Sequence, residues 1–181
     1  MRTIDPNRQV HPRIAHYVLR VSDMAASLPW YQQVLSMEVV HSAGGRLVFL
    51  TYDDEHHRMA LVETGEAERA PQGSAGLDHV AFTLDSLEDL LSNYKRLKAV
   101  GIEPVWPINH GLTTSMYYED PDGNRVEFQV ENYPTKEELN AFMHGEVFAA
   151  NPIGVNFDPD DLVARYESGE DIQSLLQQPS A

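Results

Sequence analysis

One arrangement of predicted secondary structure occurs twice in this chain of 181 residues. Two short apolar runs, RIAHYVLRV (13–21) and GLDHVAFTL (76–84), have the character of strands, and a segment with helical spacing of apolar residues follows each. A tract rich in β-forming residues comes after each helix, where SAGG and DPDG supply turns. The order strand, helix, three strands therefore repeats with an offset of about 63 residues. Such a repeat predicts two similar halves that pair to complete one structure.

The repeat predicts the fold class and the domain organisation. We expect an α+β fold built from two paired βαβββ modules that form one cupped mixed β-sheet. The paired modules cover residues 1–132, with module one at about 12–64 and module two at about 75–132. The polar, breaker-rich segment GEAERAPQGSAG joins them. The alternative is chance similarity between two βα units, which would give no shared interior.

Residues 133–181 have a different pattern and are interpreted as a helical C-terminal extension. Thr135 and Glu138 form a capping box at the start of one helix. Asp158 followed by Pro159 is typical of a second helix start. The extension is expected to pack on the two modules or on a second subunit, and the sequence favours neither.

The composition excludes several classes of function. The chain has 13 basic and 28 acidic residues, a formal net charge of −15, so nucleic acid and anionic membranes are poor partners. It has no cysteine, which excludes disulfides, thiolate metal sites and cysteine nucleophiles. The sequence starts without a basic-then-apolar signal segment, and no apolar run approaches about 18 residues. We therefore expect a cytoplasmic protein, and the acidic surface and long extension favour a homo-oligomer such as a homodimer.

Without thiols, a metal site must use imidazole and carboxylate groups. His16 and His79 occupy the same position in the first strands of the two halves, so pseudo-symmetric pairing would aim both at a shared interior. Glu127 stands between Val126 and Phe128, where a lone charge is costly to bury and a cation removes that cost. Two histidines and one carboxylate form the facial arrangement that binds non-haem Fe(II) and leaves coordination positions open. The opposing interpretation is that eight histidines and many carboxylates give such a triple by chance.

The alignment of the two halves indicates that a fourth protein ligand is missing. Placing Arg58 on Arg125 puts Ala60 where Glu127 stands. A metal site that is open at this position can bind a substrate and O2 together. Glu63 would become a fourth ligand only if the alignment slipped by an odd number of residues, because such a slip reverses the face of every side chain.

Two adjacent histidines, His56 and His57, stand at the start of a predicted strand in which Arg58, Met59, Ala60, Leu61 and Val62 follow. In an extended chain successive side chains alternate, so these two imidazoles would point to opposite faces. One of them would then enter whatever interior the sheet encloses.

The segment INHGLTTSMYYEDPDGNRVE carries the most specific pattern in the chain. From Ile108 to Glu127 it reads Ile-x-His-x5-Met-Tyr-x2-Asp-Pro-x-Gly-x3-Glu. With this pattern the chain resembles the vicinal-oxygen-chelate superfamily, and within it the type I extradiol ring-cleaving dioxygenases. The resemblance extends over about residues 12–132. It is similar to their single-domain members. The resemblance implies Fe(II), with Mn(II) as the alternative, held by His16, His79 and Glu127.

The resemblance also implies roles for three further residues. His57, the second member of the histidine pair, matches the acid–base histidine of the family. His110 and Tyr117 match residues beside the substrate, and of Tyr117 and its neighbour Tyr118 only one can face inward. The implied reaction is cleavage of a catechol-type aromatic ring by O2 next to the diol. The expected partners are therefore a small aromatic diol and O2.

Two other functions stay open on the sequence. A non-oxidative metal-dependent lyase or isomerase of the glyoxalase type would fill the position of Ala60 with a fourth ligand, and it needs neither His57 nor His110. A metal-free small-molecule-binding protein of the same fold would not need the three candidate ligands together.

Overall fold

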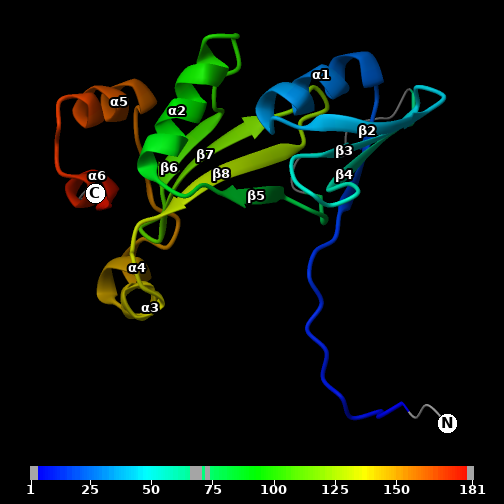
Figure 1. Ribbon diagram of the computed structural model, residues 1–181. Helices are drawn as coiled ribbons and strands as arrows, with labels where there is room; N and C mark the ends of the chain where they lie inside the picture. Colours follow the sequence, from blue (N-terminus) through cyan, green and yellow to red (C-terminus); the bar gives the residue numbers. More distant parts are fainter. Residues whose placement is uncertain (1–3, 66–70, 72–73, 179–181) are drawn as a thin grey trace. The chain divides into compact units, whose positions relative to one another are not determined.

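The computed structural model describes residues 4–65, 71 and 74–178 (Figure 1). Contacts between Cα atoms divide the chain into two compact units, residues 1–68 and residues 69–181. The first unit contains module one, and the second contains module two together with the C-terminal extension.

The first unit is a βαβββ module. Its elements are β1 (Tyr17–Val21), α1 (Met24–Val34), β2 (Glu38–Ala43), β3 (Leu47–Thr51) and β4 (Met59–Glu63). The strand order is β1-β4-β3-β2, with β1 parallel to β4 and the other pairs antiparallel. Asp23 is the N-cap of α1, since its side chain accepts a hydrogen bond from the backbone N–H of Ala25.

The second unit repeats the arrangement and adds the extension. Its module contains β5 (His79–Thr83), α2 (Leu87–Lys98), β6 (Trp106–Asn109), β7 (Thr113–Glu119) and β8 (Arg125–Glu131). The extension contains α3 (Lys136–Met143), α4 (Glu146–Ala150), β9 (Val155–Asn156), α5 (Pro159–Glu167) and α6 (Ile172–Leu176). The strand order is β5-β8-β7-β6-β9, with β5 parallel to β8.

The predicted α+β class and the two βαβββ modules are confirmed. The strands form two open mixed sheets, one in each unit, where the sequence predicted one cupped sheet. The difference arises because, among the described residues, backbone hydrogen bonds pair strands only within a unit. The short strand β9, which pairs with β6, was not predicted.

One face of each sheet is covered by the helix of its module (Figure 1). In the second unit, apolar side chains of α2 are buried with apolar side chains of β7 and β8; they are Leu90, Leu91, Leu97, Met116, Val126 and Phe128. Strand side chains alternate between faces, so their neighbours in the sequence point away from α2. The polar residues singled out from the sequence in β7 and β8 are among these neighbours.

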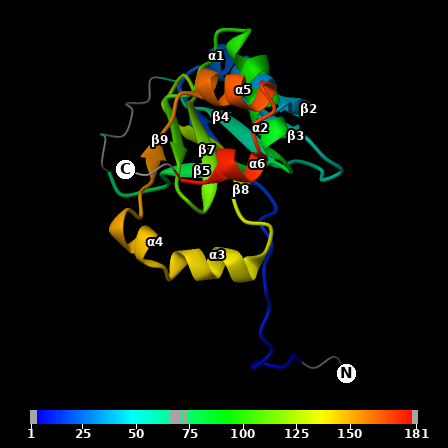
Figure 2. The same ribbon diagram turned by 90° about the vertical axis from the view of Figure 1, so that its left-hand side faces the viewer.

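The extension packs on module two. Asp160 of α5 accepts a hydrogen bond from the Tyr94 hydroxyl at 2.8 Å, and its other oxygen lies 2.5 Å from Nζ of Lys98. Thr135 caps α3 as predicted: its hydroxyl oxygen accepts from the backbone N–H of Glu138, and the hydroxyl donates to the Glu138 carboxylate. Figure 2 shows α3 and α4 together, apart from α5 and α6. The extension was expected to pack on the chain's own modules or on a second subunit. The structure shows contact with the chain's own module two.

The helices in the described part of the chain are each too short or too polar to cross a bilayer. The expected cytoplasmic location stays a prediction.

Candidate metal centre and active site

A row of polar and aromatic side chains crosses the face of the second sheet that points away from α2. The strand register places Glu127 opposite Ala81 on one side and opposite Tyr117 on the other. Trp106 is in turn opposite Tyr117. Side chains opposite one another in adjacent strands lie on the same face. His79, two residues before Ala81, therefore lies on this face as well.

His79 and Glu127 are in direct contact. Nε2 of His79 lies 3.0 Å from Oε2 of Glu127, and Glu127 is only 3% exposed. The other ring nitrogen of His79, Nδ1, lies 2.8 Å from the Asp78 carboxylate. This hydrogen bond lowers the pKa of Asp78, because it favours the charged carboxylate. A carboxylate that accepts from one ring nitrogen of a histidine fixes the orientation of the other.

The His79 and Glu127 pair fits a divalent metal. Nitrogen and oxygen ligands bind such metals at about 2.0–2.2 Å, so two ligands at right angles lie about 3 Å apart. The observed separation of 3.0 Å has this value. A cation would also offset the cost of burying the Glu127 carboxylate. Asp78 lies against the opposite edge of the ring, which suits an orienting group rather than a third ligand.

Tyr117 and His110 lie beside this pair. The ring of Tyr117 meets the ring of His79 edge to face, with 5.2 Å between centroids. Nε2 of His110 lies 3.1 Å from the Tyr117 hydroxyl. Burial raises the pKa of Tyr117, and the charge of Glu127 raises it further, so the hydroxyl keeps its proton at neutral pH. Tyr118 points to the other face, where its ring contacts Phe128.

Trp106 completes an aromatic wall on the same face. Its ring lies 4.8 Å from that of Tyr117 and 5.7 Å from that of His110, measured between centroids. Its indole N–H donates to Oδ1 of Asn156 in β9 at 3.0 Å. These rings could hold an aromatic substrate by stacking and edge contacts.

The first unit holds a second group of histidines. The centroids of the His16 and His57 rings are 4.3 Å apart, and the His57 ring meets Phe49 edge to face at 4.9 Å. Burial lowers the pKa of His57, and the neighbouring imidazoles of His16 and His56 lower it further. His57 is therefore favoured as a neutral base at neutral pH.

The expectation that His56 and His57 point to opposite faces is wrong. Strand β4 begins only at Met59, so the pair lies in the preceding loop, where strand alternation does not apply. Their Nδ1 atoms are 2.5 Å apart, so the two rings face each other.

Arg58 holds the segment that carries His16. Its guanidinium donates to the backbone carbonyls of Ile14 and Ala15 at 3.4 and 3.3 Å. The same side chain is paired with Asp53 at 2.9 Å. These contacts place the residues just before β1 against those just before β4.

The strand register supports the alignment of the two halves. Ala60 lies opposite Val18, two residues after His16, just as Glu127 lies opposite Ala81, two residues after His79. Glu63 has a different use, because it accepts from the backbone N–H of Met24 at the start of α1 and pairs with Arg46. It therefore supports α1 and is not free to act as a fourth ligand.

The structure brings the predicted residues together in two groups. His79, Glu127, Tyr117 and His110 form one group in the second unit, and His16 and His57 form the other in the first. Within either unit, the described residues include no group of three side chains able to hold a metal ion. The complete ligand set of His16, His79 and Glu127 stays a prediction.

Sequence reasoning missed the partner of His79. Asp78 directly precedes this histidine, but the equivalent residue before His16 is Ala15, so the repeat gave no signal for it. The motif DH at the start of a strand was the only available sign.

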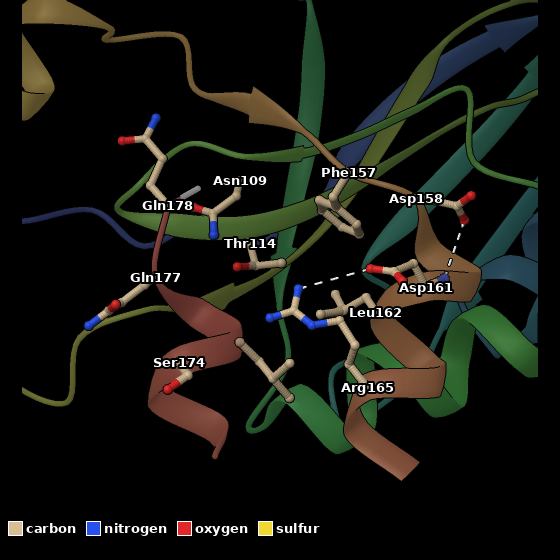
Figure 3. Close-up of a pocket in the computed structure, with 11 residues that line it drawn as sticks. Asn109, Thr114, Phe157, Asp158, Asp161, Leu162, Arg165, Ser174, Gln177 and Gln178 are labelled. Carbon is tan, nitrogen blue, oxygen red and sulfur yellow. Dashed lines mark hydrogen bonds and ion pairs between the residues drawn. The ribbon is translucent and has the colours of Figure 1, made fainter. Parts of the chain in front are cut away.

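A cavity of about 270 Å³ lies on the opposite face of the second sheet (Figure 3). Asn109 and Thr114 contribute from β6 and β7, and Leu162, Arg165 and Leu175 from α5 and α6. Figure 3 shows Arg165 turned towards Asp161, an ion pair of 4.0 Å. Since Thr114 is paired with Val130 on the helix-covered side, this cavity is separate from the His79 and Glu127 group.

The chain matches the family model of the Glyoxalase/Bleomycin resistance protein/Dioxygenase superfamily over residues 13–128. It is 50% identical to biphenyl-2,3-diol 1,2-dioxygenase 2 of Rhodococcus globerulus over 149 residues, which are 82% of this chain and 78% of that protein. It is 45% identical to biphenyl-2,3-diol 1,2-dioxygenase 3 of the same organism, over 88% of this chain and 85% of that protein.

More distant similarity extends to lyases of the same family. A lactoylglutathione lyase of Neisseria meningitidis is 32% identical over 64% of this chain and 88% of the lyase. The crystal structure of lactoylglutathione lyase from Agrobacterium tumefaciens shares the fold with a TM-score of 0.54 and 23% identity, over 67% of this chain and 96% of that one. The chain therefore belongs to the Glyoxalase/Bleomycin resistance protein/Dioxygenase superfamily.

Proposed function

We propose that the chain is an Fe(II)-dependent extradiol dioxygenase that cleaves a catechol-type aromatic ring with O2, next to the diol. The observation that carries this proposal is the buried Glu127 carboxylate 3.0 Å from Nε2 of His79, with the Tyr117 ring against His79. The similarity to two biphenyl-2,3-diol 1,2-dioxygenases supports it. A catechol that carries a second ring is accordingly the first substrate class to test.

His16, His79 and Glu127 would hold the metal, with Mn(II) as the alternative to Fe(II). When bound, the metal would supply a redox-active centre for O2 and would lower the pKa of the diol. Two neutral imidazoles and one carboxylate are the ligand set suited to such a centre, because they leave coordination positions for substrate and O2.

His57 would accept a proton from the diol and later return it. Its ring contacts those of His16 and Phe49, and burial lowers its pKa, which favours the neutral imidazole that can act as a base. Neutral histidine has one nitrogen that accepts and one that donates, as this exchange requires.

His110 and Tyr117 would orient the diol. An imidazole nitrogen of His110 lies 3.1 Å from the Tyr117 hydroxyl on the face of the sheet that points away from α2. Once substrate is bound, the Tyr117 hydroxyl can donate to an oxygen atom that gains negative charge during the reaction, and the ring nitrogen of His110 without a hydrogen can accept from a diol hydroxyl. Trp106 would face the substrate rings from the neighbouring strand.

The runner-up function is a non-oxidative lyase or isomerase of the glyoxalase type. The 32% identity to a lactoylglutathione lyase favours it, but Ala60 then stands where a fourth ligand is expected. A metal-free binding protein would have no use for a buried carboxylate beside a histidine ring nitrogen. The homo-oligomer expected from the sequence stays a proposal.

The test is oxygen uptake by anaerobically iron-loaded protein. A panel of monocyclic and bicyclic catechols, including biphenyl-2,3-diol, should give stoichiometric O2 consumption and a yellow ring-opened product. Protein loaded with Ni(II) or Zn(II) and offered a glutathione hemithioacetal tests the runner-up in parallel. No colour and no O2 uptake across the panel, with isomerase activity in the parallel assay, would reject ring cleavage.

A further inference from the structure

Three parts of the C-terminal extension surround the loop that carries His110. Strand β9 pairs with β6 so that Val155 is opposite Asn109, the residue directly before His110. From α3, Phe142 lies so close to Gly111 that a Cβ atom added there would be 2.4 Å from its ring. The short helix α6 supplies the Leu176 carbonyl, which accepts from the Asn109 side chain at 3.0 Å.

The contact between His110 and Ile153 determines how the imidazole is protonated. Nδ1 of His110 lies 2.5 Å from the backbone carbonyl oxygen of Ile153. A carbonyl can only accept, so Nδ1 must carry the hydrogen. In the neutral ring Nε2 is then an acceptor, and it faces the Tyr117 hydroxyl at 3.1 Å. The extension thus selects one of the two tautomers and aims its lone pair at Tyr117.

Gly154 allows the extension to approach this closely. A Cβ atom at this position would lie 2.2 Å from the Asn109 carbonyl oxygen and 2.7 Å from Cα of His110. Its φ angle of +112° is also one that other residues rarely adopt. Any side chain at position 154 must therefore push the segment away from His110.

Asn109 fixes the other side of the same loop. Its Oδ1 accepts from the backbone N–H of Gly111 at 2.8 Å and from the Asn132 amide at 3.0 Å. Asn109 is 3% exposed, and Figure 3 shows it at the edge of the cavity, beside Gln178. The loop is thus held by hydrogen bonds on the side facing α6 and by Ile153 on the side of the imidazole.

We propose that residues 153–154 of the extension are positioning residues for the ring-cleavage reaction: the Ile153 carbonyl holds His110 as the Nδ1-protonated tautomer, and Gly154 makes this contact sterically allowed. The inference rests on the proposed function, in which His110 orients the diol. It assigns the extension a task in the active site that a module pair alone would lack. His110 with the other tautomer would present an N–H to Tyr117, and the phenol could no longer donate to that nitrogen.

The test compares Gly154→Ala with Gly169→Ala in the full-length chain. Gly169 also belongs to the extension and has a positive φ of +85°, but nothing lies within 4 Å of its Cβ position. Both variants carry backbone strain, and only Gly154→Ala displaces Ile153. Since misplacement by about 1 Å can cost about 10²-fold in rate, we expect kcat to fall by that order in Gly154→Ala relative to Gly169→Ala.

A second measurement reads the tautomer directly. Long-range ¹H–¹⁵N spectra of histidine rings, recorded on the full-length chain without added metal, distinguish the two neutral forms. The His110 signals are assigned by their loss in His110→Gln. We expect the Nδ1-protonated form in the wild type and in Gly169→Ala, and its loss in Gly154→Ala.

The outcomes separate this inference from the proposed function. An Nε2-protonated His110 in the wild type overturns the inference whether or not Gly154→Ala folds. Equal kcat and equal spectra for the two glycine variants overturn it as well. If the iron-loaded wild type cleaves no catechol, the proposed function fails. The spectra still decide separately whether the extension holds His110 as the Nδ1-protonated tautomer.

Discussion

Ala60 occupies in the first sheet the register position that Glu127 occupies in the second. Ala60 lies opposite Val18, which is two residues after His16. Glu127 lies opposite Ala81, which is two residues after His79. One half of the repeat therefore offers a histidine and a carboxylate, and the other offers a histidine and a methyl group. This asymmetry is the feature of the chain that favours ring cleavage over glyoxalase-type chemistry.

Filling that position should abolish ring cleavage. Ala60→Glu adds a carboxylate at the site related to Glu127, so we expect divalent metal to bind at least as tightly and O2 uptake to be lost. Ala60→Gln is the matched control, because Ala60 is buried and both side chains disturb packing equally, but only Glu adds a charge. Metal titration and an oxygen electrode give the two readouts. Equal O2 uptake by the two variants would contradict an open coordination position at this point.

Removing the orienting partner of His79 should weaken metal binding. In Asp78→Ala, Nδ1 of His79 loses the carboxylate at 2.8 Å, and such partners are worth about 10–100-fold in metal affinity. Asp85→Ala, which removes an exposed carboxylate from the same unit, controls for net charge. Competition against a chelator measures the affinity of each. A loss of the same size in both variants would show that Asp78 acts only through its charge.

His57 should affect turnover without affecting metal content. We expect His57→Ala to retain iron and to lose about 10²–10⁴ in kcat, the usual contribution of a general acid–base group. His144→Ala is the control, since His144 is exposed at the end of α3. Iron analysis and steady-state kinetics on the same samples separate the two effects. Loss of iron together with activity would instead make His57 a residue that supports His16.

Local patterns were sufficient to predict most of the fold. Caps such as Thr135 and Asp158 and turns such as DPDG act within a few residues, so the sequence records them directly. Strand β9 has two residues, and α4 and α6 have five each, which is too short for a periodic signal. Strand β9 exists because it pairs with β6, and α6 lies against Asn109 of β6; local sequence reveals neither contact.

The sequence could predict only those parts of the candidate site that are formed by side chains. The repeat and the motif identified His79, Glu127, His110 and Tyr117, and the structure places these four in one group. The Ile153 carbonyl belongs to the backbone, which every residue has, so no residue type marks it. The orientation of His56 was predicted wrongly because β4 starts later than the apolar pattern indicated.

Acid should release α5 from α2. The Lys98 ammonium, followed by the Tyr94 hydroxyl, holds the pKa of Asp160 below its ordinary value. Because the pKa in the folded chain is lower than the value of about 3.9 in the unfolded chain, the contact stabilises the fold above that pH and is lost as pH falls through the lowered value. Asp160→Asn should therefore increase hydrogen exchange in α5 at pH 7 and have little effect at the acid end of the titration. Asp161→Asn provides the comparison, since Asp161 lies in the same helical turn but 4.0 Å from its partner Arg165. If both variants raise exchange equally at pH 7, the contact with Lys98 and Tyr94 contributes nothing specific, and the extension is held by its apolar contacts and by β9 alone.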